Sequence, residues 1–256
     1  MLQVFKSYLA YLIKAKNLHR VHSPFVFDLY QDCIKSEKNY YVFNKIEYRR
    51  KQLLIDRRTI EGNDPGAGKN ERQLVSEIAR KSLVSPDFGK ILFELTRKLE
   101  CKNVLELGTS LGISASYLAS YSSDCLVYTI EGRNEIAEIA KETFDSLNQV
   151  NVKLYNGLFD DVLPTILKPE TKFDLVYLDG NHRLDATLGY VQKLIPHLHE
   201  NSVIVVDDIR WSSEMWNAWK KLKSMDNFHV NIDLMRMGLL FTRPSQAREN
   251  FTLYYK

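Results

Sequence analysis

Short apolar runs alternate with amphipathic segments from residue 103 to residue 224. Five apolar runs of four to six residues, each followed by a segment of helical period, lie between residues 103 and 224. Such runs are typical of strands buried on both faces of a parallel sheet. The runs are Asn103–Leu107, Leu126–Ile130, Val152–Tyr155, Phe173–Leu178 and Ser202–Val206, and the helical segments are Gly112–Ser120, Asn134–Leu147, Asp160–Leu167, Leu184–Leu198 and Ser213–Ser224.

Two further apolar runs, His229–Leu234 and Gly238–Thr242, follow with only a short turn between them. No crossover helix fits into such a turn, so these runs predict an antiparallel hairpin. The pattern therefore predicts an α/β fold with a mostly parallel, seven-stranded sheet that ends in a C-terminal antiparallel hairpin. Apolar positions from Phe88 to Leu99 predict a helix before the first strand.

The N-terminal part of the chain has a different pattern. Residues 1–60 are rich in aromatic residues and helical in period, while the composition of Glu61–Asn70 predicts a loop. The glycine spacing in this loop does not fit a P-loop for nucleoside triphosphates. We expect an N-terminal helical extension over residues 1–84, a sheet domain over 85–247 and a tail over 248–256. The extension is predicted to cap the sheet or to mediate a homodimer.

Composition limits the class of protein. A chain of 256 residues with 45% hydrophobic and 26% charged residues suits a globular protein that can bury a core. No apolar stretch approaches the roughly 18 residues of a membrane helix, and we find no export signal. Three cysteines that lie far apart argue against a disulfide framework and a structural zinc site. We therefore expect a cytoplasmic protein without a membrane partner.

Charge is unevenly distributed along the chain. Residues 1–100 hold 19 basic and 12 acidic residues, whereas residues 101–256 hold 16 and 20. A basic N-terminal part suits a solvated helical surface, and an anionic substrate, nucleic acid or lipid headgroups are the alternatives. The basic residues are scattered, which favours the solvated surface.

A glycine-containing loop follows the first predicted strand, over Glu106–Gly112. A dinucleotide fingerprint, Gly-x-Gly-x-x-Gly, would need glycine where the chain has Glu106 and Leu111. The actual pattern, Glu-x-Gly-x-x-x-Gly, resembles motif I of the class I S-adenosylmethionine-dependent methyltransferases. Glu131 ends the second strand, where a carboxylate can accept hydrogen bonds from ribose hydroxyls.

This resemblance implies a Rossmann-like class I methyltransferase fold with S-adenosylmethionine as the cofactor. It implies that Glu106 orders the loop and meets the ammonium group of the methionine part. Ser114 and the first turn of the following helix would hold the methionine carboxylate. The end of the third strand would border adenine. The cofactor-binding residues expected in this way are Glu106, Gly108, Ser110, Gly112, Ser114, Glu131, Gly157, Leu158, Phe159 and Asp179.

Acidic residues follow the fourth and fifth predicted strands. Asp179 follows the fourth, and Asp207 and Asp208 follow the fifth. In the strand order that the methyltransferase resemblance implies, these two strands are adjacent, about 5 Å apart, so the carboxylates can converge. Three oxygen donors suit Mg²⁺ or a similar divalent cation. The pattern resembles the cation-dependent O-methyltransferases of the catechol and caffeoyl-coenzyme A type, in which an asparagine stands at the position of Asp208. The resemblance implies a metal site at Asp179, Asp207 and Asp208; in the alternative, Asp179 lines the substrate pocket without a metal.

His182 lies three residues after Asp179, where the catechol enzymes have a catalytic lysine. Imidazole has an ordinary pKa of about 6.5, which suits a general base at neutral pH. We therefore expect His182 and Asp179 to be catalytic; a histidine at a helix start that bonds to the backbone is the alternative. A rival metal cluster of His197, His199 and Asp207 is excluded, because the histidines precede the fifth strand and Asp207 follows it.

The predicted function is S-adenosylmethionine-dependent O-methylation of a small hydroxylated molecule. An RNA methyltransferase that uses the basic N-terminal part and a non-catalytic S-adenosylmethionine-binding protein are the alternatives. No Asn/Asp-Pro-Pro-aromatic motif follows the fourth strand and no basic stripe is interleaved with aromatics, which disfavours nucleic acid. The stretch His22–Phe27, together with the Asp64–Lys69 loop and Lys81–Pro86, resembles a group of bacterial class I methyltransferases. This resemblance does not identify the methyl acceptor.

Overall fold

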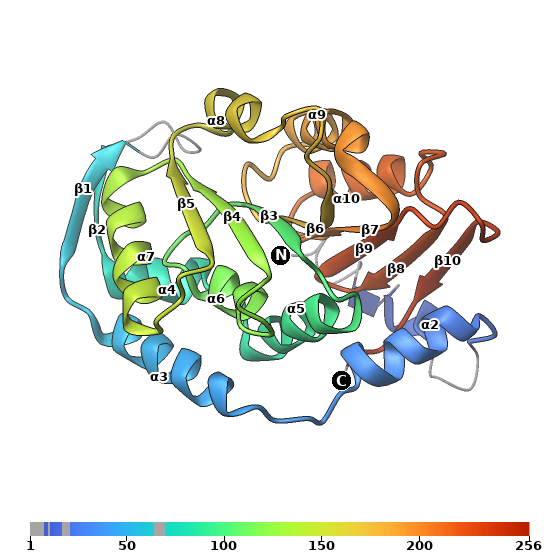
Figure 1. Cartoon of the computed structure of the whole chain (residues 1–256), viewed down its shortest axis with the longest axis horizontal. Helices are drawn as coiled ribbons and strands as arrows, with labels where there is room; N and C mark the ends of the chain where they lie inside the picture. Colours follow the sequence, from blue (N-terminus) through green and yellow to red (C-terminus); the bar gives the residue numbers. More distant parts are fainter. Residues whose placement is uncertain (1–7, 10, 17–20, 64–69, 256) are drawn as a thin grey trace. The chain divides into compact units, whose positions relative to one another are not determined.

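The computed structural model describes residues 8–9, 11–16, 21–63 and 70–255. The chain divides into two compact units, unit 1 with Met1–Ser36 and Pro169–Lys256, and unit 2 with Glu37–Lys168. The strands of the main sheet number eight in the described residues, of which five belong to unit 1 and three to unit 2 (Figure 1).

Unit 2 contains three parallel strands in the order β3-β4-β5. They are β3 (Asn103–Leu107), β4 (Leu126–Glu131) and β5 (Val152–Asn156). The crossover helices are α6 (Ile113–Ala119) and α7 (Asn134–Ser146), and α8 (Phe159–Ile166) follows β5. All four residues at positions 104–107 of β3 are buried, as expected for a strand covered on both faces.

Helices and a hairpin from the N-terminal part complete unit 2. The helices are α3 (Tyr41–Ile55), α4 (Val75–Ser82) and α5 (Pro86–Lys98). Helix α5 begins at Pro86, two residues before the predicted Phe88, because the Ser85 hydroxyl accepts from the backbone N–H of Phe88 and Pro86 occupies the first turn. The hairpin pairs β1 (Thr59–Asn63) with β2 (Asn70–Leu74) in an antiparallel register.

This hairpin differs from the predicted loop over Glu61–Asn70. Residues 64–69 lie outside the described residues, and the polar sequences on either side pair as strands. Turn composition marked the connection but did not reveal the strands, because neither β1 nor β2 has an alternating apolar pattern.

Unit 1 contains five strands in the order β10-β8-β9-β7-β6. Strands β6 and β7 are parallel, β9 is antiparallel to both β7 and β8, and β10 is parallel to β8. The predicted mostly parallel sheet with a C-terminal hairpin is confirmed. The strands are β6 (Phe173–Leu178), β7 (Leu198–Val206), β8 (Val230–Leu234), β9 (Met237–Phe241) and β10 (Glu249–Thr252).

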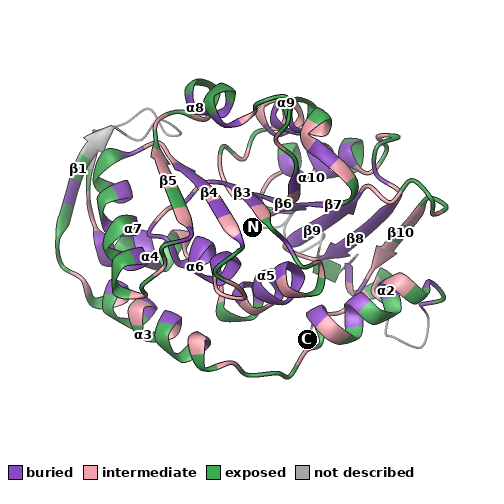
Figure 2. Ribbon diagram, viewed as in Figure 1, coloured by how far each residue is buried: buried purple, intermediate pink, exposed green. Residues whose placement is uncertain are grey.

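Unit 1 has a helix in its N-terminal segment and a helix after each of the strands β6 and β7. They are α2 (Pro24–Leu29), which continues into a π-helical turn (Tyr30–Ile34), α9 (Leu184–Leu194) with a 3₁₀ turn (Ile195–His197), and α10 (Ser213–Leu222). Strands β8 and β9 are buried at every position, and Figure 2 shows them in the colour of buried residues. Among the described residues, no helix is long and apolar enough to span a membrane.

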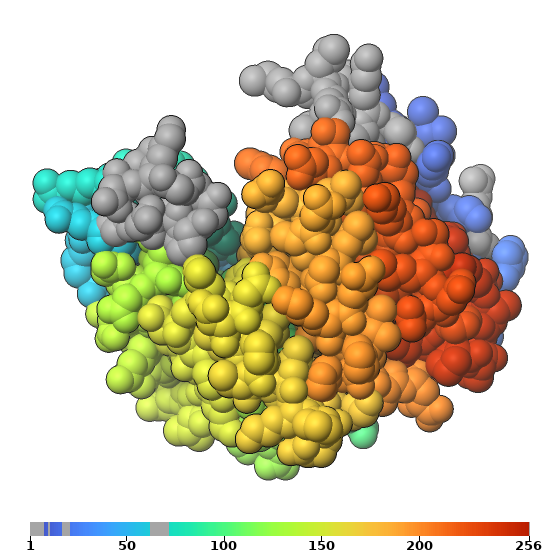
Figure 3. Space-filling view, turned by 90° about the horizontal axis from the view of Figure 1, so that it is seen from above, coloured from blue at the N-terminus to red at the C-terminus, as the bar shows by residue number. Residues whose placement is uncertain are grey.

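The eighth strand, β10, lies in the segment predicted as a tail. Phe251 pairs with Ile232 of β8, and Leu253 is fully buried. The Tyr11 hydroxyl donates to the Leu253 carbonyl at 2.6 Å, so N-terminal residues lie beside the C-terminal strand (Figure 3). A strand of four residues with a single large apolar residue carries too short a pattern to be recognised in the sequence.

Candidate active site

The loop between β3 and α6 has a backbone that requires glycine at two positions. Gly108 has φ +106° and Gly112 has φ +86°, conformations that glycine adopts without steric cost. A Cβ atom on Gly112 would lie 2.9 Å from the Phe144 ring. Gly112 immediately precedes α6 and thereby brings the first turn of that helix close to the loop. The motif found in the sequence thus corresponds to a loop of defined shape.

Glu131, at the end of β4, connects its own strand to this loop. One carboxylate oxygen accepts from the Ser110 backbone N–H at 2.8 Å, and the other accepts from the Arg133 N–H at 3.0 Å. Burial raises the pKa of Glu131, although both N–H donors lower it. The Ser110 hydroxyl in turn lies 2.7 Å from the hydroxyl of Ser82. Glu131 and Ser110, both predicted to bind the cofactor, are therefore joined by a direct hydrogen bond.

A pocket of about 280 Å³ lies at this junction within unit 2. Its lining includes four residues that sequence reasoning missed: Gln73, Lys81, Ser82 and Arg133. Arg133 is only 7% exposed and donates to the Gln73 side chain at 3.3 Å. Gln73 belongs to β2, for which the sequence offered no motif. Lys81 and Ser82 end α4, in a stretch whose resemblance to bacterial methyltransferases gave them no role in the site. The position of Arg133, two residues after Glu131, was the available signal.

Glu106 is a fully buried carboxyl group at the end of β3. The hydroxyl of Thr129 donates to it at 2.5 Å. Burial raises the pKa of Glu106 to about 8, against the hydroxyls of Ser114 and Thr129, which lower it. Glu106 and Ser114, both expected to contact the methionine part, are therefore close to each other.

The end of β5 lies beside the end of β4. The Gly157 backbone N–H donates to the Glu131 carbonyl at 2.9 Å, and Leu158 precedes α8 with 49% of its surface exposed. Phe159 is the first residue of α8. Contacts of Gly157, Leu158 and Phe159 with adenine stay a prediction.

In unit 1, the acidic residues after β6 and β7 converge as predicted. Leu178 pairs with Val206 in the parallel register, so the two strands end side by side. The Tyr177 hydroxyl lies 2.9 Å from Asp207 Oδ2 and 3.3 Å from Asp179 Oδ2. One phenol therefore bridges the carboxylates of the two strand ends.

Asp207 also contacts an arginine that sequence reasoning missed. Arg236, in the turn between β8 and β9, donates from Nε to Asp207 Oδ1 at 3.0 Å and from Nη2 to Oδ2 at 3.1 Å. Its Nε lies 3.0 Å from Asp208 Oδ1 as well. The pairing of Val206 with Gly238 brings this turn next to the end of β7. The predicted hairpin placed Arg236 in a turn, but nothing in the sequence paired its side chain with Asp207.

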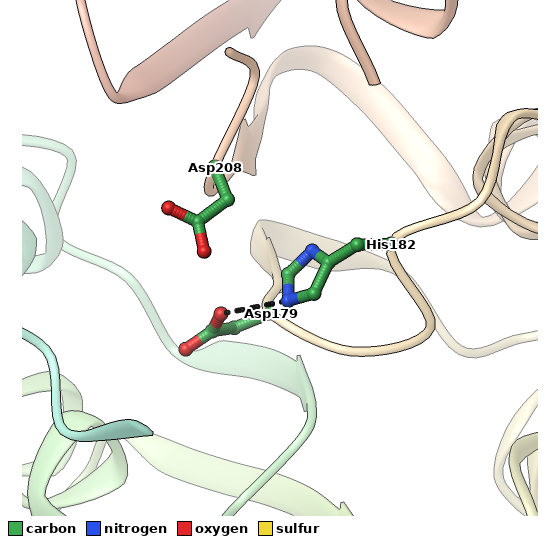
Figure 4. A group of neighbouring side chains, drawn as sticks. All are labelled: Asp179, His182 and Asp208. Carbon is green, nitrogen blue, oxygen red and sulfur yellow. Dashed lines mark ion pairs between the residues drawn. The ribbon is translucent and has the colours of Figure 1, made fainter. Parts of the chain in front are cut away.

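His182 lies in the loop between β6 and α9, with its imidazole near the acids (Figure 4). Its Nε2 is 3.7 Å from Asp179 Oδ1, and the side chain is 29% exposed. Asp208 has φ +51°, and burial together with the charge of Asp207 raises its pKa, while Arg236 and His182 lower it. Strained backbone of this kind clusters at functional sites.

The donor set tests the metal site expected at Asp179, Asp207 and Asp208. Asp207 does not fit this role, because Arg236 and Tyr177 already bind its carboxylate. A different group has suitable spacing: one ligand atom each from Asp179, His182 and Asp208 lies within 4.8 Å of the others. The acids therefore converge, but not as the three-carboxylate site that the resemblance implied.

A mostly parallel sheet with a terminal antiparallel hairpin, a glycine loop after β3 and acids after β4, β6 and β7 define a class I methyltransferase. The family described as a methyltransferase domain matches residues 105–209. A catechol O-methyltransferase from Mycobacterium tuberculosis is 30% identical over 154 residues, which cover 59% of this chain and 68% of that protein. The chain belongs to the S-adenosylmethionine-dependent O-methyltransferases.

Other relatives agree with this assignment. A catechol O-methyltransferase from Niastella koreensis is 30% identical over 129 residues, 49% of this chain and 58% of that protein. The O-methyltransferase TomG from Streptomyces achromogenes, solved in complex with SAM, has a TM-score of 0.57 at 20% identity and covers 80% of this chain and 91% of its own. The similarity to TomG, at 20% identity, shows the fold alone.

Proposed function

We propose that the chain transfers the methyl group of S-adenosylmethionine to a hydroxyl oxygen of a small molecule. Glu106, Glu131 and the glycine loop would bind the cofactor. His182 and its acidic neighbours would act on the acceptor. Solved relatives carry the cofactor or its product, S-adenosylhomocysteine, which supports the cofactor assignment.

The observation that carries the proposal is the placement of His182 next to Asp179. Methyl transfer breaks the bond from sulfur to the methyl carbon and forms a carbon–oxygen bond, so the acceptor hydroxyl must lose its proton. His182 would take that proton, and the carboxylate 3.7 Å from Nε2 would stabilise the resulting imidazolium. S-adenosylhomocysteine and the methyl ether would then leave.

A divalent cation held by Asp179, His182 and Asp208 is the second candidate arrangement. The spacing of their ligand atoms, within 4.8 Å, would admit such an ion, but Arg236 Nε lies 3.0 Å from Asp208 Oδ1 and competes with it. When bound, such an ion would lower the pKa of the acceptor hydroxyl. His182 would then be a ligand rather than the base. The relatives named catechol O-methyltransferase support a small hydroxylated acceptor; a cytoplasmic location and a homodimer stay predictions.

The test compares two histidines that each face an aspartate. His182→Gln should lower kcat about 10²- to 10⁴-fold, the usual contribution of a general base, and leave cofactor affinity nearly unchanged. His199→Gln is the matched control, because His199 lies 3.0 Å from Asp174 but belongs to β7, whose other end leads to Asp207. Release of S-adenosylhomocysteine with catechol and simple phenols as probes measures both. Equal rates for His182→Gln and the wild type would refute the base.

A further inference from the structure

Arg236 places a permanent positive charge among the acids that follow β7. Its side chain reaches back from the turn between β8 and β9, and its backbone carbonyl accepts from the Ile209 N–H at 2.9 Å. Both ends of the residue are therefore fixed to the segment after β7. Burial lowers the pKa of Arg236, but Asp207 and Asp208 raise it by more, so the guanidinium stays charged.

The carboxylate of Asp207 has no acceptor site left for another cation. A carboxylate offers about four lone-pair sites on its two oxygens. Oδ1 accepts from Arg236 Nε and from the Asp208 backbone N–H, and Oδ2 accepts from Arg236 Nη2 and the Tyr177 hydroxyl. A metal ion on Asp207 would have to break at least one of these bonds.

Burial makes the pairing with Arg236 necessary. The Asp207 side chain is fully buried, and an isolated buried carboxylate is very costly unless it is paired and hydrogen-bonded. Arg236 supplies both the charge and two of the four hydrogen bonds. Its planar guanidinium suits this bidentate contact, whereas a lysine ammonium acts as a point charge.

The charge count agrees with this role. Asp207 and Asp208 place two consecutive carboxylates at the end of β7. Arg236 Nε lies 3.0 Å from an oxygen of each, so one cation faces both negative charges.

We propose that Arg236 is the resident cation of this site and takes the place of a divalent ion at Asp207 and Asp208. Arg236 is then a positioning residue, which holds Asp207 in the core and directs Asp208, and methyl transfer by this chain requires no divalent metal. The inference rests on the proposed function in one respect: it takes methyl transfer to be the reaction that the residues after β6 and β7 serve.

Manganese binding tests the inference without a known acceptor. Full-length wild type, Arg236→Gln, Arg236→Lys and the control Arg248→Gln are titrated with Mn²⁺ and followed by electron paramagnetic resonance. Arg248 pairs with the exposed Asp226, so its replacement changes the charge equally but leaves the acids after β7 untouched. Wild type, Arg236→Lys and Arg248→Gln should bind no stoichiometric Mn²⁺ at millimolar concentration. Arg236→Gln should bind one ion at least tenfold more tightly than the wild type.

Three outcomes would overturn the inference. They are one tightly bound Mn²⁺ in the wild type, unchanged Mn²⁺ binding in a folded Arg236→Gln protein, or loss of wild-type turnover with chelator and its recovery with Mg²⁺. If Arg236→Gln does not fold, the wild type and Arg236→Lys still decide. Absence of turnover with every acceptor would count against the proposed function alone, because the manganese titration needs no turnover.

Discussion

Glu106 is the residue whose surroundings alter its chemistry most clearly. With a pKa raised to about 8 by burial, it is mostly protonated at pH 7 in the free chain. The ammonium group of S-adenosylmethionine would favour the carboxylate form, so cofactor binding should release a proton. Affinity should therefore rise with pH up to about 8, by at most tenfold per pH unit.

Calorimetry measures this proton directly. Binding of S-adenosylmethionine is titrated at pH 7 in two buffers that differ in ionisation enthalpy. The difference between the two heats, divided by the difference in ionisation enthalpy, should correspond to about one proton released per site. Glu106→Gln, which cannot ionise, should bind more weakly and give equal heats in both buffers. Equal heats for the wild type would mean that Glu106 keeps its proton when the cofactor binds.

Single residues could be found from the sequence where they lie at the end of a strand. Glu106, Glu131 and Asp179 were located because each directly follows, or ends, an apolar run, and parallel strands deliver such residues to one edge. Arg236 was not, since its role depends on the reach of a side chain from a neighbouring hairpin. Short-range patterns do not encode such tertiary contacts.

At the scale of elements, two glycines in helices give a matched pair. A Cβ on Gly89 of α5 would lie 2.5 Å from the Tyr117 ring of α6, whereas a Cβ on Gly189 of α9 would meet no atom within 4 Å. Gly89→Ala should lower the free energy of unfolding by about 1–3 kcal/mol through overpacking. Gly189→Ala should raise it by roughly 0.4–1 kcal/mol, because alanine restricts the unfolded chain.

Urea denaturation of both variants checks this pair of opposite signs. A Gly89→Ala protein as stable as the wild type would mean that Tyr117 can move away from α5. Its hydroxyl donates to Glu47 of α3 at 2.8 Å, which holds the ring in place. The Gly189→Ala result calibrates the helix-propensity contribution that both substitutions share.

Elements with strong periodicity were predicted almost to their ends. Strands β3 and β6 begin and end at the predicted residues, and α10 begins at the predicted Ser213. The polar hairpin of β1 and β2 and the four-residue β10 were missed. Their strand character comes from pairing with a partner strand rather than from their own apolar pattern.

At the scale of the whole molecule, the predicted N-terminal extension of residues 1–84 is divided between the units. Residues 1–36 group with the C-terminal part and residues 37–84 with the first three strands of the main sheet. In unit 1, Phe25 of α2 packs on Phe241 of β9 with ring centroids 5.1 Å apart. Sequence pattern identified apolar helices here but could not tell which surface each would cover, because that depends on contacts between residues far apart in the chain.

Unit 1 is formed by two separate stretches of the chain, which the ribosome synthesises at different times. Unit 2 is a single continuous stretch, whereas residues 1–36 must wait for partners that begin at residue 169. At about 5–20 residues per second, the ribosome needs roughly 7–26 seconds to add residues 37–168. Throughout that interval the apolar side of α2 has no strand β9 to cover it, so the nascent chain offers a binding site to chaperones. Pulsed hydrogen exchange during refolding should protect β3, β4 and β5 before α2; simultaneous protection would show that the two units fold together.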